Sequence, residues 1–303
     1  MPQSSAASFA SSQKSTIVRS NFIQRAALGT VRPFFHGLSR MAPGAASKVA
    51  RNIFLKPPRH ASPTRELWWA TEAEEWALPF STGKLAAWRW GWGGPKILLV
   101  HGWGGRGLQL GAFAQPLVEA GYEVVAYDAP GHGRSVGERS SLPELSSAVA
   151  EMVHHLGGVH AIVAHSAGAA AVTAALGRPG TPLPVERLVY VSPSVDMIDV
   201  TRRFARAVGF TEGIADRMRQ GIERNYGVLF DDLQGLRIAP RMDRPLLVIH
   251  DRGDREIGVE EGHALARAWP RASFMATENL GHQRVLRDPA VVAQAVGFVI
   301  GSD

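Results

Sequence analysis

Short apolar runs alternate with longer amphipathic stretches through most of the chain. Continuous apolar runs, typical of strands buried on both faces, occupy residues 97–100, 124–127, 161–164 and 246–249, and further strands are expected at 187–191 and 273–276. Helical spacing is found at residues 108–120, 143–156, 168–176, 259–269 and 289–300. This alternation predicts an α/β fold with a mostly parallel sheet that has helices on both faces.

Two stretches depart from this alternation. Residues 67–70 and 85–90 are aromatic-rich, and we interpret them as two antiparallel strands joined by a turn at Ser81-Thr82-Gly83. Residues 194–242 are polar and helical without a strong strand, which predicts a small helical cap over the carboxyl edge of the sheet. We therefore expect a partly helical extension at residues 1–60 and an α/β domain at 61–303 that contains this cap.

The N-terminal extension carries the basic charge of the chain. Residues 1–65 contain ten Lys and Arg and no Asp or Glu, although the chain as a whole has a net charge of only +6. Its helical rhythm from residue 22 to 55 is interrupted at Pro33 and at Pro43-Gly44. Short amphipathic helices docked on the body are the favoured interpretation. Peripheral contact of residues 17–55 with an anionic membrane surface is the alternative.

Composition excludes several classes of protein. The absence of cysteine removes disulfides, Cys-ligated zinc, iron–sulfur clusters and a Cys nucleophile. No apolar run reaches the roughly 18 residues of a membrane-spanning helix, and no signal-peptide core is present. A cytoplasmic location is expected, although the Ser- and Arg-rich start also suits an organellar transit peptide. No nucleic-acid-reading motif, metal site or cofactor motif is found, so the expected partner is a small molecule.

The candidate nucleophile is Ser166. It follows the apolar run Ile162-Val163-Ala164, and the small residues Ala167-Gly168 come directly after it. A strand that ends in a tight turn before a helix presents such a serine at the carboxyl edge of the sheet, where ligands bind in folds of this kind. A serine hydroxyl needs a neighbouring base to become nucleophilic.

Three histidines follow Ser166 in the chain. His250 ends an apolar strand and His263 lies within a helix, whereas His282 lies in the segment after the last strand, where a base can reach the serine. We therefore predict that His282 is the general base. Asp254 is the preferred acid, with Asp251 as its rival in the same loop and Asp196 as a more distant candidate.

An oxyanion hole requires two preorganised N–H donors. Ala167 supplies one from the start of its helix, and the loop His101-Gly102-Trp103-Gly104-Gly105 supplies the other, for which we favour the backbone N–H of Trp103. His101, Gly102 and His165 adjoin these donors, and we expect them to contact the substrate.

Together these motifs resemble those of the α/β-hydrolase superfamily. The resemblance covers roughly residues 85–300 and rests on five segments in the expected order: residues 101–105, 128–135, 164–168, 251–254 and 281–282. It implies an eight-stranded sheet, a nucleophile elbow and a cap before the acid strand, and a loop-shaping role for residues 128–135. One departure from the usual Gly-x-Ser-x-Gly elbow is Ala164, which is small enough for close packing of helix and strand.

The expected activity is hydrolysis of carboxylic esters or thioesters through an acyl-enzyme on Ser166. The serine argues against the dehalogenase and epoxide-hydrolase branches, which the resemblance associates with Asp at the elbow. Acyl transfer, lyase chemistry or cofactor-free peroxidase chemistry on the same fold is the alternative, and a catalytically silent ligand-binding protein is a third possibility. The small cap favours short to medium acyl groups.

Overall fold

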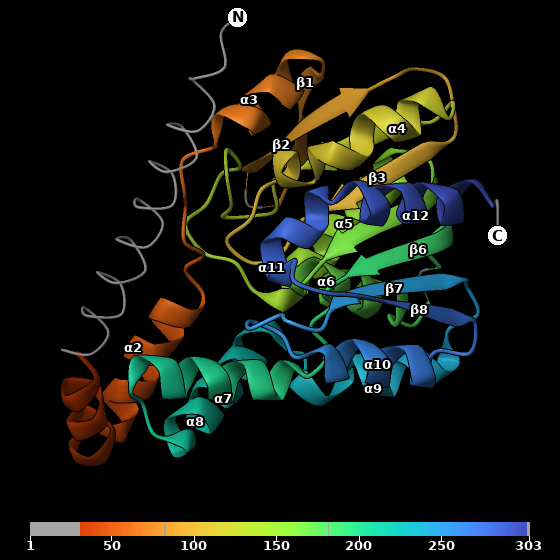
Figure 1. Ribbon diagram of the computed structural model, residues 1–303. Coiled ribbons are helices and arrows are strands. Elements are labelled where there is room, and N and C mark those ends of the chain that lie inside the picture. Colours follow the sequence, from red (N-terminus) through yellow and green to blue (C-terminus); the bar gives the residue numbers. More distant parts are fainter. Residues whose placement is uncertain (1–30, 82, 181, 302–303) are drawn as a thin grey trace, which may run out of the picture. The chain divides into compact units, whose positions relative to one another are not determined.

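An eight-stranded sheet organises the larger part of the protein (Figure 1). The structure is a computed structural model that describes residues 31–81, 83–180 and 182–301. In spatial order the strands are β1 (Glu74–Phe80), β2 (Gly83–Trp90), β4 (Glu123–Tyr127), β3 (Lys96–Val100), β5 (Val159–His165), β6 (Val185–Val191), β7 (Leu246–Asp251) and β8 (Ala272–Thr277). β2 pairs antiparallel with β1 and β4, and every pair from β4 to β8 is parallel. The predicted α/β fold with a mostly parallel eight-stranded sheet is confirmed.

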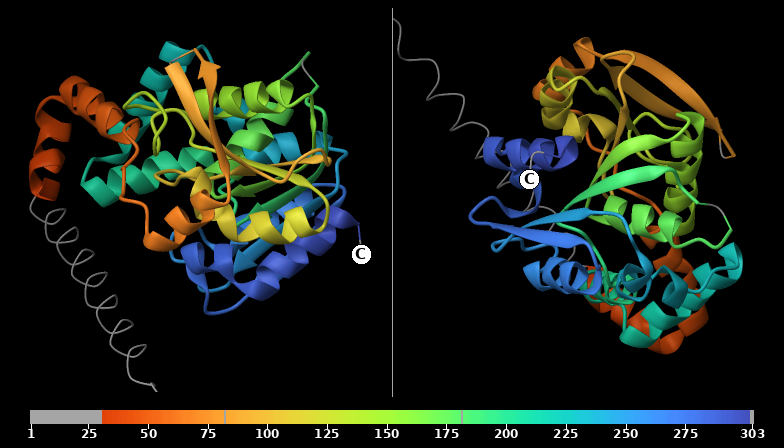
Figure 2. Two further views of the ribbon diagram at one scale, coloured as in Figure 1. Left: turned by 90° about the horizontal axis from the view of Figure 1, so that it is seen from above. Right: turned by 90° about the vertical axis from the view of Figure 1, so that its right-hand side faces the viewer.

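Helices lie on both faces of this sheet (Figure 2). The helices of this part are α3 (Thr64–Thr71), α4 (Ala114–Glu119), α5 (Leu142–His155), α6 (Ala167–Leu176), α9 (Gly235–Ile238), α10 (Val259–Ala268), α11 (Gly281–Arg284) and α12 (Pro289–Ile300), with the 3-10 helices η1 (Gly107–Phe113), η2 (Phe230–Leu233), η3 (Ala239–Arg241) and η4 (Val285–Arg287). Residues from α4 and α12 share one apolar core with alternate residues of the strands, such as Leu99 and Val163. Strands β3 to β7 are almost wholly buried, as their continuous apolar runs predicted.

The predicted strand at residues 67–70 is wrong, because these residues belong to α3. Glu66, Trp69 and Ala70 face inward at helical spacing, while Leu67 and Trp68 are more than half exposed. The first strand of the hairpin is β1 instead, and its partner β2 contains the predicted residues 85–90. Four aromatic and apolar residues fit the spacing of a helix as well as that of a strand, so this run is too short to distinguish the two.

A second structural unit combines residues 31–54 with Asp199–Asn225. It contains a helix at residues 31–41, α2 (Pro43–Phe54), most of α7 (Met197–Val208) and most of α8 (Glu212–Tyr226). The predicted interruption at Pro43-Gly44 is confirmed, since residue 42 separates the two N-terminal helices, whereas Pro33 lies within the first of them. Residues 1–30, which hold the start of the predicted helical rhythm, lie outside the described residues.

Aromatic pairs hold this second unit together. The ring centroids of Phe35 and Phe210 are 4.6 Å apart, and those of Phe54 and Phe204 are 5.1 Å apart. The N-terminal helices therefore pack against helices from the predicted cap, two stretches that are far apart in the sequence. In the described part of the chain, no helix has the length and apolarity that crossing a membrane requires. The membrane-surface role of residues 17–55 stays a prediction.

Candidate active site

Ser166 lies in the tight turn between β5 and α6, near the middle of the sheet. Its backbone angles are φ 53° and ψ −122°, a left-handed conformation that is unfavourable for a residue with a side chain. Such strain is characteristic of functional sites, where surrounding packing holds the residue in place. The turn therefore has the geometry of a nucleophile elbow, with Ala164 in the place usually taken by glycine.

Gly168 allows α6 to approach the neighbouring loop. A Cβ atom at this position would lie 2.5 Å from the carbonyl oxygen of His101 and 2.7 Å from that of Val100. Both oxygens belong to the backbone, so neither can move without displacing β3 or the loop that follows it. The glycine is required by this close approach rather than by its own backbone angles.

Replacement of Gly168 by alanine is expected to lower the free energy of unfolding by about 1–3 kcal/mol, because the added methyl group overpacks the contact. Gly297 in α12 is a matched control, since nothing lies within 4 Å of a Cβ at that position. Gly297→Ala is expected to stabilise the protein by up to about 1 kcal/mol through helix propensity alone. Urea denaturation of both variants measures the difference, and equal effects at the two sites would contradict this account of the elbow.

The structure brings three of the predicted residues into one chain of contacts. His282, on the short helix α11 rather than in an irregular loop, has its Nε2 atom 3.1 Å from Ser166 Oγ. The Nδ1 atom of the same ring lies 2.7 Å from Asp254 Oδ2. A carboxylate can only accept, so Nδ1 carries the proton and Nε2 presents its lone pair to the serine hydroxyl. This is the tautomer that a general base requires.

Asp254 and Asp251 have different surroundings. Asp254 Oδ1 accepts the backbone N–H groups of Glu256 and Ile257, and this leaves Oδ2 directed at His282. Asp251, the last residue of β7, accepts from Gly253 N in the following turn, and from Thr277 Oγ1 and Leu280 N at and beyond the end of β8, at 2.9–3.0 Å. Asp251 therefore joins the turn after β7 to the segment after β8. Asp196, on the loop after β6, accepts from Ile198 N and Gln234 Nε2.

Hydrogen bonding keeps the Asp254 carboxylate ionised. Burial alone would raise the pKa of Asp254, but donors from His250, His282 and the backbone N–H of Ile257 outweigh burial and hold that pKa well below its ordinary value. A carboxylate that stays charged can stabilise the imidazolium that forms when His282 accepts a proton.

The loop after β3 runs directly alongside the serine. A Cβ atom on Gly102 would lie 2.9 Å from Ser166 Cβ, so the backbone leading to Trp103 passes the nucleophile at van der Waals distance. Ala167 is the first residue of α6, where backbone N–H groups point out of the helix. Each predicted oxyanion donor is thus next in sequence to a residue at this contact: Trp103 follows Gly102, and Ala167 follows Ser166.

His101 and His165 are both buried, and their ring nitrogens bond to the backbone. His101 Nε2 accepts from Ala129 N at 2.9 Å, so its Nδ1 carries the proton and lies 2.7 Å from Gly102 O. Burial lowers the pKa of His101 to about 4, so the ring is neutral near pH 7. His165 Nε2 donates to the carbonyl oxygen of His282 at 3.1 Å. In this arrangement both rings shape the site's backbone, while the Nδ1 atom of His165 is buried without a hydrogen-bond partner.

Two further contacts lie near the site, and the first of them was not predicted. Glu66 of α3 is 1% exposed and pairs with Arg106, which directly follows the 101–105 loop. The Asp128 carboxylate accepts from Gly107 N and Arg134 N, in agreement with a loop-shaping role for residues 128–135. Glu66 and Arg106 are separated by 40 residues, and no local pattern connects them.

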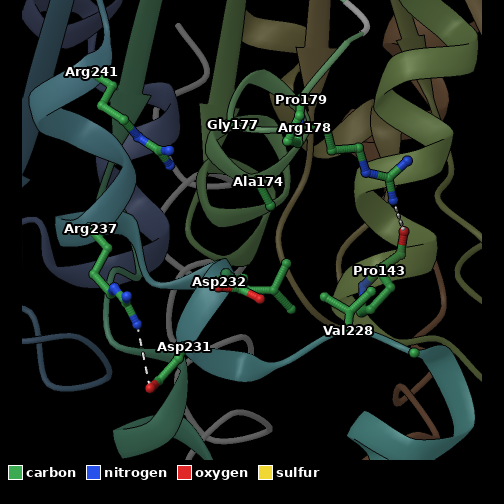
Figure 3. A pocket seen from close by; sticks show the side chains of 12 residues that line it. Pro143, Ala174, Gly177, Arg178, Pro179, Val228, Asp231, Asp232, Arg237 and Arg241 are labelled. Carbon is green, nitrogen blue, oxygen red and sulfur yellow. Dashed lines mark hydrogen bonds and ion pairs between the residues drawn. The ribbon is translucent and has the colours of Figure 1, made fainter.

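A cavity of about 650 Å³ lies away from the serine (Figure 3). Its walls come from Pro143 of α5, the carboxyl end of α6 around Ala174 and residues 227–241. Ala174 is eight residues beyond Ser166, about 12 Å along the helix axis. Two arginine side chains of this cavity interact locally: Arg237 pairs with Asp231, and Arg178 donates to the carbonyl of Pro143. The cavity is therefore separate from the Ser166 site.

Among the residues that the structure describes, no three His, Asp or Glu side chains are grouped as a metal site would need. The groups at Ser166 are instead arranged for nucleophilic chemistry: a hydroxyl, a base with its lone pair directed at it, and a carboxylate behind the base.

A model of the family described as "Serine aminopeptidase, S33" matches residues 95–295, which include Ser166, Asp254 and His282. This match covers well over half of the 303-residue chain. The protein belongs to this α/β-hydrolase family.

Several solved structures have the same fold. A protein described as a lipase from Acinetobacter baumannii AYE is 20% identical, with a TM-score of 0.61 over 78% of this α/β-hydrolase and 94% of that chain. A membrane phospholipase A is 18% identical, with a TM-score of 0.59 over 96% of this chain and 98% of the other. At these identities the likeness shows the fold alone.

One curated protein is similar over a shorter stretch. The dihydrolipoyllysine-residue acetyltransferase component of the acetoin cleaving system of Pseudomonas putida is 41% identical over 93 residues. The match spans 29% of this α/β-hydrolase and only 25% of that relative's length.

Proposed function

We propose that this α/β-hydrolase is a serine hydrolase that cleaves carboxylic esters or thioesters through an acyl-enzyme formed on Ser166. The observation that supports the proposal is the continuous chain of contacts from Ser166 Oγ to His282 Nε2 at 3.1 Å, and from His282 Nδ1 to Asp254 Oδ2 at 2.7 Å. A serine at a strained elbow with a base of the correct tautomer has the arrangement that acyl transfer to serine needs.

In the first half of the reaction, Ser166 Oγ attacks the substrate carbonyl carbon as His282 Nε2 takes the hydroxyl proton. The resulting imidazolium is stabilised by ionised Asp254, and the tetrahedral oxyanion is stabilised by the backbone N–H groups of Ala167 and Trp103. His282 then donates the proton to the leaving alkoxide or thiolate, and the bond from the carbonyl carbon to that group breaks.

In the second half, water replaces the leaving group. His282 removes a proton from the water, which attacks the acyl carbon, and the same proton returns to Ser166 Oγ as the acid departs. His282 is thus neutral again at the end of each cycle, while Asp254 stays ionised throughout.

Labelling with a fluorophosphonate probe tests the proposal. We expect one equivalent of probe to attach at Ser166, as located by peptide mass spectrometry, and no attachment in His282→Ala. Ser146→Ala is a matched control, because Ser146 is a buried serine in α5 whose hydroxyl has no hydrogen-bond partner. Absence of labelling in the unmodified protein would contradict the proposal and favour a catalytically silent binding protein.

Acyl transfer is the second candidate, favoured by the acetyltransferase component among the relatives. It uses the same acyl-enzyme, with an alcohol, amine or thiol in place of water in the second half. Turnover of p-nitrophenyl esters from acetate to palmitate, with and without an added acceptor, separates the two reactions. Product partitioning toward the acceptor at millimolar concentration would assign transfer, and release of free acid alone would assign hydrolysis.

A further inference from the structure

A second histidine approaches the same oxygen atom of Asp254 that binds His282. His250 is the penultimate residue of β7, and its side chain has no exposed surface. Its Nε2 atom lies 3.1 Å from the carbonyl oxygen of Ile257 and 3.5 Å from Asp254 Oδ2. Because the Ile257 carbonyl can only accept, Nε2 carries the ring proton. One N–H group therefore faces both the acid and the loop that carries it.

The environment of the other ring nitrogen argues against a purely space-filling role. Nδ1 of His250 is buried without a hydrogen-bond partner, which is unfavourable for a polar atom. An apolar side chain of similar volume would avoid this cost. The imidazole offers one thing that an apolar residue lacks, the N–H directed at Asp254 and Ile257.

The helix packed on this ring is adapted to it. Gly262 lies in the second turn of α10, where glycine is unfavourable compared with alanine. A Cβ atom at Gly262 would lie 2.5 Å from His250 Nδ1. The imidazole ring thus packs directly against the helix at Gly262. This contact leaves the ring no room to turn away from Asp254.

We propose that His250 is a positioning residue that fixes the orientation of the Asp254 carboxylate toward His282, an inference that rests on the proposed hydrolase function. The N–H of His250 is directed at two points of the loop after β7, the Oδ2 atom of Asp254 and the carbonyl oxygen of Ile257. The backbone N–H groups of Glu256 and Ile257 hold the other carboxylate oxygen, Oδ1. Asp254 is therefore held on both oxygens before His282 contacts it. His250 acts through Asp254 and does not touch the substrate.

Substitution at His250 tests this role. His250→Leu keeps the volume and removes the donor, and we expect kcat for a p-nitrophenyl ester to fall roughly 10- to 100-fold, the loss typical of a small misplacement in an active site, with KM within about twofold. His250→Gln keeps an N–H donor and should recover most of kcat. Gly262→Ala displaces the ring and should also lower kcat, whereas Gly297→Ala, with open space at its Cβ, should not.

A double-mutant cycle separates positioning from general destabilisation. If His250 acts through Asp254, His250→Leu should have little further effect on kcat in an Asp254→Asn background. An equal loss in both backgrounds, or an unchanged kcat in His250→Leu, would overturn the inference.

A readout without substrate distinguishes this inference from the proposed function. The Nδ1–H proton of His282, bonded to Asp254, should give a far-downfield proton NMR signal in the unmodified protein. We expect that signal to move or disappear in His250→Leu and to persist in Gly297→Ala. An unchanged signal in His250→Leu would overturn the positioning role whatever the activity, whereas failure of Ser166 to react with the fluorophosphonate would overturn only the hydrolase function.

Discussion

Replacement of Ser166 by alanine is expected to lower kcat for p-nitrophenyl esters by about 10⁶-fold, the loss typical of removing a serine nucleophile. The remaining turnover would come from the oxyanion donors and from binding alone. Steady-state kinetics at several enzyme concentrations measure the residual rate. Turnover that survives at the unmodified level in Ser166→Ala would assign the chemistry to another residue.

The same position should reveal the cost of the elbow in folding stability. The left-handed φ of 53° at Ser166 is unfavourable for serine and alanine alike, but not for glycine. Ser166→Gly is therefore expected to be as inactive as Ser166→Ala. Relief of the backbone strain should raise its free energy of unfolding above that of Ser166→Ala by about 1–3 kcal/mol, less the part lost because glycine gives the unfolded chain more entropy. Thermal unfolding of the two variants at one pH tests this, and a less stable Ser166→Gly would indicate that the turn is unstrained.

Asp254→Asn is expected to lower kcat by about 10⁴-fold. An amide at this position no longer requires Nδ1 of His282 to carry the proton, and it does not stabilise the imidazolium. The pKa of Asp254 lies well below its ordinary value, so the unmodified protein keeps this charge throughout the neutral range.

Asp251→Asn provides the contrast. Its carboxylate accepts three hydrogen bonds that join the turn after β7 to the segment after β8, so we expect a loss of about 1–3 kcal/mol in stability and a change in kcat of less than about tenfold. Activity and urea denaturation of the two variants together separate the roles. A larger loss of kcat in Asp251→Asn than in Asp254→Asn would reverse the assignment of the acid.

Much of the sheet was predictable because its strands are buried on both faces. Runs such as Leu98-Leu99-Val100 are short and apolar at every position, which is typical of strands covered on both faces. The convergence of Ser166, Asp254 and His282 followed from the same observation, since the carboxyl ends of parallel strands share one edge of the sheet. The position of each of these three residues, shortly after a predicted strand, was enough to predict that they lie close together.

Features that depend on distant pairings were not predictable in this way. The aromatic run at residues 67–70 is too short to distinguish the residue spacing of a helix from that of a strand. The contact of Glu66, in the same helix, with Arg106 joins residues 40 positions apart, so no local pattern predicts it. The sequence placed His250 at the end of an apolar strand, but its contact with Asp254 depends on how the loop after β7 folds back.

The packing of residues 31–54 with Asp199–Asn225 also bears on synthesis of the chain. Phe35 leaves the ribosome roughly 175 residues before Phe210, its aromatic partner. At typical elongation rates of about 5–20 residues per second, this interval lasts roughly 10 to 35 s. During that time these helices lack the partner that packs against Phe35 and Phe54, so the contacts within this unit can form only after residues 199–225 have been made.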